Sequence, residues 1–205
     1  MIHLNTPLFA SLFFTCLLTL TTGCSPEKAP AKEYVLTAGE LETVERIGSE
    51  ASQALKKSLG TQLKAALQSG GPENALRVCQ QVAQPLTIQT SENLAKATVT
   101  RTALRFRNQA NAPTEQDREI LSEWENLLEK GAELTQSKII STGPDQAIYY
   151  KPILTESVCL KCHGDPSGFS PALSKRLAES YPDDNAIHFA TGDLRGAFRV
   201  VIELD

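Results

Sequence analysis

The chain has 205 residues, with 20 Lys and Arg against 24 Asp and Glu, so its formal net charge at pH 7 is -4. This mild acidity argues against the basic surface that nucleic-acid binding requires, and we expect no nucleic-acid partner. The length that remains after an N-terminal apolar segment suits one domain with its own hydrophobic core. With 5 Cys and 3 His in the whole chain, any clustering of these residues is informative.

The N-terminal apolar run from Leu8 to Leu20 is too short to cross a bilayer but suits the apolar region of a secretory signal. It leads to "LTTGCSP", in which small residues precede Cys24 as they do at a lipobox. Two features depart from that pattern, because residues 1–23 contain no Lys or Arg and Thr21 stands where Leu is typical. We expect a lipoprotein signal peptide over 1–23 and a periplasmic protein held at a membrane by a lipid on Cys24. An ordinary signal peptide cut nearby, or a retained anchor, is the alternative.

A short polar tether and the start of a folded domain follow the lipid site. Residues 24–36 are rich in Pro and Ala and are expected to hold the domain of residues 37–205 off the membrane. Apolar residues recur every three or four positions from Glu40 to Gln68, which predicts an amphipathic helix. The sequence "SGGP" at 69–72 ends this helix.

A second helix is predicted to start at Pro72 or Glu73 and to stop before Pro85, which cannot continue it. On this helix Cys79 shares the apolar face with Ala75. The pattern therefore directs the Cys79 thiol toward the core.

The rest of the chain predicts a mixture of short helices and strands, which favours the α+β class. In chain order these are a helical turn opening at Ser91, a strand over 97–106, a turn over 108–113, a helix capped by Thr114 and ending at Gly131, a strand over 147–154, a helix over 170–180 and a strand over 196–204. Alternation in the first strand would place Arg101, Arg105 and Arg107 on one face, where their guanidinium groups could pair with haem propionates. A solvated basic face is the alternative.

Cys159, Cys162 and His163 form the motif C-x-x-C-H within "CLKCHG". This spacing lets two thiols bond to the vinyl groups of a haem while the imidazole binds its iron. We therefore expect one covalently attached haem c, with Cys159 and Cys162 as attachment residues and His163 as a metal ligand. The predicted export agrees with this, because bacteria complete such attachment outside the cytoplasm.

The ligand on the opposite face of the iron can be narrowed by counting donors. Met1 is the only methionine and leaves with the signal, which excludes His/Met coordination. The strong donors that remain are Cys79 and His188, unless that face is open or holds a weaker group. Cys79 is also the one cysteine not committed to the signal, the lipid or the haem. It could be a small buried apolar residue, or a thiolate ligand that lowers the reduction potential.

Several separated segments resemble the Tll-type c-haem domain family, long catalogued as a domain of unknown function. They are "ALRVCQQVA", "VTRTALRFRNQANAP", "YYKPI" with "CLKCHG", and "YPDDNAIHFATGDLRGAF", and the resemblance spans Leu41 to Glu203. It implies a PAS-like antiparallel sheet with flanking helices, and His and Cys as axial ligands, which by position are His163 and Cys79. Gln109 stands where the family usually has Pro. His188 stands where Gly is usual, so we expect it to be a surface residue rather than a ligand.

Two other uses of a C-x-x-C pair fit the sequence less well. A thiol-disulfide redox site expects the pair at a helix N-terminus in a βαβ unit, which the preceding elements do not resemble. A zinc site needs four ligands, and the adjacent Cys162 and His163 cannot easily occupy two corners of one tetrahedron.

A haem protein of this kind belongs to one of two functional classes. A sensor would use a redox change, or displacement of the Cys79 thiolate by a small gas, to shift the fold between two arrangements. An electron carrier would keep both ligands and expose a haem edge to a redox partner. The PAS-like resemblance favours sensing, which requires a separate signalling partner protein. Catalysis is not expected, because "GDLRG" lacks the partners of a nucleophile and Asp183 with Asp184 predicts only a turn.

Overall fold

The fold is known from a computed structural model that describes residues 34–134 and 136–205. The predicted signal peptide, the Cys24 lipidation site and the tether up to residue 33 lie outside the described residues. Within the described part, no helix combines the length and the apolar character needed to span a membrane.

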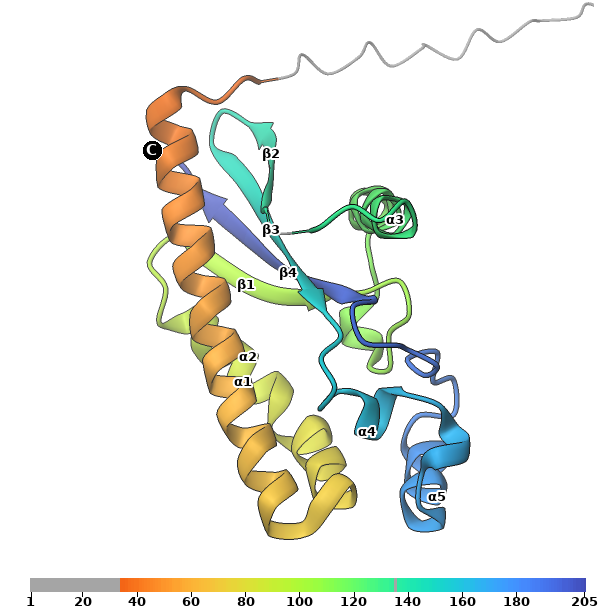
Figure 1. Ribbon diagram of the computed structural model, residues 1–205. Coiled ribbons are helices and arrows are strands. Elements are labelled where there is room, and N and C mark those ends of the chain that lie inside the picture. Colours follow the sequence, from red (N-terminus) through yellow and green to blue (C-terminus); the bar gives the residue numbers. More distant parts are fainter. Residues whose placement is uncertain (1–33, 135) are drawn as a thin grey trace, which may run out of the picture. The chain divides into compact units, whose positions relative to one another are not determined.

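The described chain folds as helices around an antiparallel sheet, which confirms the predicted α+β class (Figure 1). Its elements are α1 (Ala38–Gln81), α2 (Ala83–Glu92), β1 (Ala97–Thr102), α3 (Glu115–Glu129), β2 (Lys138–Gly143), β3 (Gln146–Leu154), α4 (Leu160–His163), α5 (Pro171–Ser180) and β4 (Leu194–Glu203). The strand order is β1-β4-β3-β2, and all neighbouring strands are antiparallel.

Helices cover both faces of the sheet, because successive side chains of a strand point to opposite sides. Tyr149 of β3 is buried on the face that packs against α1, and Tyr150 is buried on the face that packs against α3. Gly48 allows α1 to approach closely, because a Cβ atom there would lie 2.1 Å from Cγ of Tyr149. The two faces therefore hold two separate apolar clusters.

Helix α1 is interrupted where the sequence predicts. Gly70 has a non-helical ψ of 24° and Gly71 has a φ of 66°, a conformation that glycine adopts without steric cost. Pro72 begins the next helical stretch, whose Leu76 packs against α5 in a third apolar cluster. The chain reverses at this break and returns along the lower part of the molecule in the view of Figure 1. The reversal brings the segment that carries Cys79 next to α4, which contains Cys162 and His163, and next to α5.

A buried carboxylate ties α3 to the sheet. Asp117, which is 2% exposed, accepts hydrogen bonds from the hydroxyl of Tyr150 at 2.6 Å and from Nε of Arg199 at 3.1 Å. It also forms the capping box of α3 with Thr114, the predicted cap. Burial and the contact with Asp117 raise the pKa of Tyr150. This cluster fixes α3 against β3 and β4.

Two local predictions are wrong, and one strand is missed. The strand predicted over 97–106 ends at Thr102, and the following segment is irregular. The helical turn expected at Ser91 belongs to α2, which begins at Ala83 and carries Pro85 in its first turn, where proline costs no hydrogen bond. Strand β2 was not predicted, although its β-branched run before a Gly-Pro-Asp turn is a usable signal.

Candidate functional site

One cavity of about 260 Å³ brings together every residue predicted to attach or ligate a haem. Its walls come from both halves of α1, the adjoining ends of β1 and β4, and the α4 region. Among its lining residues are Leu59, Leu63, Leu76, Cys79, Arg101, Arg107, Cys159, Cys162, His163, Arg195 and Phe198. Most of this lining is apolar, and its polar members are cysteine, histidine and arginine together with Lys56, Thr102 and Asn111.

The C-x-x-C-H segment forms a single helical turn. The amide of His163 donates to the carbonyl of Cys159 at 2.9 Å, and so does the amide of Cys162, at 3.1 Å. This turn places both cysteines and the histidine on the cavity wall. Both cysteines are free thiols, and burial raises the pKa of Cys162 to about 11, which keeps it protonated near neutral pH.

The imidazole of His163 is oriented by one short hydrogen bond. Its Nδ1 lies 2.6 Å from the carbonyl oxygen of Ala186, and since a carbonyl only accepts, Nδ1 carries the proton. Burial, and then the charges of Arg195 and Arg107, hold the pKa of His163 well below its usual value. The ring is therefore neutral, and Nε2 keeps a free lone pair. A metal-binding histidine uses this tautomer when its second nitrogen is held by a carbonyl.

Cys79 lines the cavity rather than packing into the apolar core. Its side chain is exposed to the cavity space, although the surrounding walls are close enough that desolvation raises the pKa of its thiol. The nearby charges of Arg101, Arg107 and Arg195 partly oppose this rise. A cysteine in this setting stays a thiol until a cation replaces its proton.

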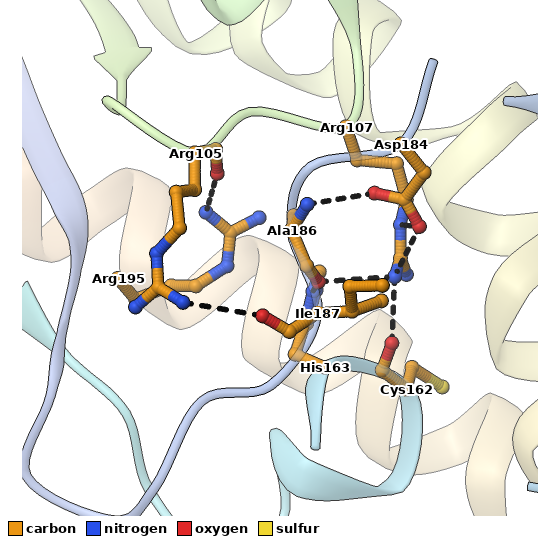
Figure 2. Close-up of polar contacts among 8 residues, drawn as sticks. All are labelled: Arg105, Arg107, Cys162, His163, Asp184, Ala186, Ile187 and Arg195. Atoms are coloured by element: carbon orange, nitrogen blue, oxygen red, sulfur yellow. Dashed lines mark hydrogen bonds and ion pairs between the residues drawn. The ribbon is translucent and has the colours of Figure 1, made fainter. Parts of the chain in front are cut away.

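The three arginines predicted to share a strand face do not do so, because β1 ends at Thr102. Arg101 lines the cavity, and its buried Nε has no hydrogen-bond partner in the described structure. Arg105 does not line the cavity. Its guanidinium lies 3.6 Å above the ring of Phe189. It also donates to the carbonyl of Ile187 at 3.2 Å (Figure 2).

Arg107 lines the cavity but is already engaged. Its Nε donates to Asp184 at 2.9 Å, and its Nη2 donates to the carbonyl of Cys162 at 2.7 Å (Figure 2). The Asp184 carboxylate, which the sequence suggests only as part of a turn, is thus the counter-ion of a buried guanidinium.

Arg195 is a cavity residue that sequence reasoning missed. It lies at the start of β4, and burial, followed by the charges of Arg107 and Arg101, lowers its pKa to about 10. Among the described residues, Asp184 is the one carboxylate that forms an ion pair with Arg101, Arg107 or Arg195, and it pairs with Arg107. The cavity therefore carries an excess of positive charge beside an apolar wall.

This donor set fits an apolar macrocycle with two acidic side chains. The unpartnered Nε of Arg101 and the desolvated guanidinium of Arg195 would both gain from an anion in the cavity. Two thiols and a neutral imidazole lie on the same wall, and a third thiol comes from a different helix.

His188 lies outside this cavity. Its side chain is exposed, and its amide donates to the carbonyl of Gly164 at 2.9 Å, just after the motif. Its φ of 60° is a left-handed conformation that costs a residue with a Cβ atom about 1–2 kcal/mol. The backbone next to His163 is thus strained at this position.

Comparison with known proteins gives consistent matches. The model of the Tll0287-like family matches residues 31–203. Among solved structures, the crystal structure of the cyanobacterial heme-protein Tll0287 matches with a TM-score of 0.55 and 26% sequence identity, over 83% of this chain and 98% of that chain. No curated protein gives a significant match.

Replacing His188 by glycine should stabilise the protein by about 1 kcal/mol, because glycine adopts the left-handed backbone without steric cost. His188→Ala is the matched control, since it removes the imidazole but keeps the Cβ atom. Denaturant unfolding of the three proteins measures the effect. An alanine variant as stable as the glycine variant would show that backbone strain is not the cause.

Proposed function

The chain belongs to the Tll0287-like family, and we propose that it is an exported c-type haem protein that senses redox state or a small gas. The observation that carries this proposal is the convergence of Cys79, Cys159, Cys162 and His163 on one cavity. Cys79 comes from α1 while the other three residues belong to the α4 turn, so their meeting is a property of the fold rather than of the motif alone. The match to a solved heme-protein supports the same cofactor.

Each residue on the cavity wall has a role in this proposal. Cys159 and Cys162 would attach the haem through thioether bonds, and His163 would bind the iron through Nε2. Cys79 would bind the iron as a second ligand. Arg101 and Arg195 would pair with the propionates, because both line the cavity whereas Arg105 does not.

When bound, haem supplies an iron atom that alternates between ferric and ferrous states and can exchange an axial ligand. The surrounding residues set the environment of that iron. A thiolate from Cys79 would favour the ferric state of the iron. The positive charges of the cavity arginines would instead favour the ferrous state, which carries one positive charge less. The largely apolar lining would lower the local dielectric constant and so strengthen both effects. The proposal includes no catalytic reaction.

Sensing is supported by the position of Cys79 on the chain. It lies beyond the break at Gly70 and Gly71, on a segment that packs against α5, while His163 belongs to α4. Release of Cys79 would free the segment after this break to move relative to the sheet, and this movement is the two-state change that a sensor needs. An unidentified partner protein would read the change.

Electron transfer is the second candidate, and the cavity rim favours it. Val158, next to the attachment motif, lines the cavity and is 37% exposed. An apolar rim of this kind suits contact with a redox partner.

Location rests on the sequence alone: we propose a periplasmic protein anchored to a membrane through Cys24. Metabolic labelling with a fatty acid tests this, because the label should be lost in Cys24→Ala.

Cys79→Ala should abolish the thiolate signature of the ferric protein in its electronic and EPR spectra, because no other cysteine remains for the opposite face. Its reduction potential should rise, since a negative ligand is lost. Val78→Ala is the matched control, because it shortens a neighbouring cavity-lining side chain and keeps the sulfur. A thiolate signature that persists in Cys79→Ala would contradict the ligand assignment.

The two candidate functions differ in how the reduced protein responds to CO or NO. A sensor should bind the gas and lose its thiolate spectrum, because the gas takes the place of Cys79. An electron carrier should keep both ligands through repeated oxidation and reduction. Absorption spectra of the reduced protein with and without gas distinguish the two, and unchanged spectra would contradict gas sensing.

A further inference from the structure

The backbone of Ala186, whose carbonyl holds the imidazole of His163, is fixed through both its N–H and its C=O group. Its N–H donates to Oδ1 of Asp184 at 2.9 Å. Its carbonyl oxygen accepts from His163 Nδ1 at 2.6 Å and from Arg107 Nη2 at 3.2 Å (Figure 2). A carbonyl that is fixed in this way presents its lone pairs to the imidazole in one direction only.

Arg107 connects the carbonyl of Ala186 to the helical turn that carries Cys162. It donates to Asp184 at 2.9 Å and to the carbonyl of Cys162 at 2.7 Å, so one guanidinium bridges the α4 turn and the loop before β4. The side chains of Arg107 and Asp184 are 7% and 11% exposed, so water scarcely competes for these charge-assisted bonds. Arg107 thereby fixes the position of the α4 turn relative to the loop before β4.

We propose that Arg107, fixed by Asp184, is a positioning residue that holds the Nδ1 hydrogen bond of His163 and thereby the direction of its Nε2. The inference rests on the proposed haem function. The distances show how it acts: the imidazole is the near donor to Ala186, at 2.6 Å, and Arg107 at 3.2 Å is the far one. Arg107 therefore restrains the position of the Ala186 carbonyl and competes only weakly with His163 for its oxygen. Its stronger bonds go to Cys162 and Asp184.

The charge of Arg107 and its geometry act on the reduction potential in distinguishable ways. Loss of a nearby positive charge would lower the potential, because it favours the ferric state. Loss of positioning would raise the potential, because an imidazole with a weaker Nδ1 hydrogen bond donates less electron density to the iron. Arg107→Lys keeps the charge but cannot reproduce the planar fork that reaches three acceptors.

The test uses the full chain with haem attached. NMR of the reduced protein labelled with ¹⁵N-histidine measures exchange of the His163 Nδ1 proton, and spectroelectrochemistry measures the midpoint potential. Arg107→Lys should accelerate this exchange about tenfold, as expected for loss of one hydrogen bond of ordinary net strength, and should raise the potential. Lys161→Gln is the control, because it removes a charge from the exposed side of α4 without touching either carbonyl.

Exchange and potential in Arg107→Lys that stay within the range of the Lys161→Gln control would overturn the proposal. If Arg107→Lys does not accumulate as a haem protein, Asp184→Asn gives the same readout, because it keeps the size of the side chain and weakens the anchor of Arg107. A smaller acceleration is expected there, and none would overturn the proposal. A wild-type protein without covalent haem would instead contradict the proposed function itself.

Discussion

The reversal of α1 at Gly70 and Gly71 is the constraint on which the site depends. Without it, Cys79 would continue along a straight helix, away from the α4 turn that carries His163. The positive φ of Gly71 makes the reversal sterically cheap, and Pro72 starts the returning helix. Packing of this returning segment against α5 then encloses one side of the cavity. A feature of backbone geometry thus decides which side chains can share one ligand.

Electrostatics give the cavity its second property. Three guanidinium groups lie on its wall, and in the described chain a single carboxylate pairs with them. The guanidinium groups differ in their partners. Arg107 binds protein carbonyls and Asp184, whereas the Nε of Arg101 has no hydrogen-bond partner in the described structure. Buried charges without partners are unfavourable in a protein alone, so such a cavity favours an anionic ligand. The same burial keeps His163 neutral and able to bind a metal.

Sequence and structure differ most where function depends on contacts between distant segments. C-x-x-C-H is readable because its three groups are neighbours in the chain, and the α1 break and the Thr114 cap are readable from local turn and capping rules. The class of fold follows from the order of elements. Arg195 and Asp184 could not be found, because pairing of β4 with β1 and the return of the 181–190 loop create their surroundings. Strand alternation does not locate Arg105 correctly, because the strand ends at Thr102 and Arg105 lies beyond it.

The proposed function depends on one haem bonded to Cys159 and Cys162 in the cavity of this chain. The most direct measurement is a reduced pyridine haemochrome spectrum of denatured protein from a host with cytochrome maturation machinery, combined with mass mapping of the haem-bearing peptide. We predict that the spectrum survives denaturation and that the haem mass is found on the peptide containing residues 159–163. A colourless protein, or haem that is extracted completely on denaturation, would contradict the claim.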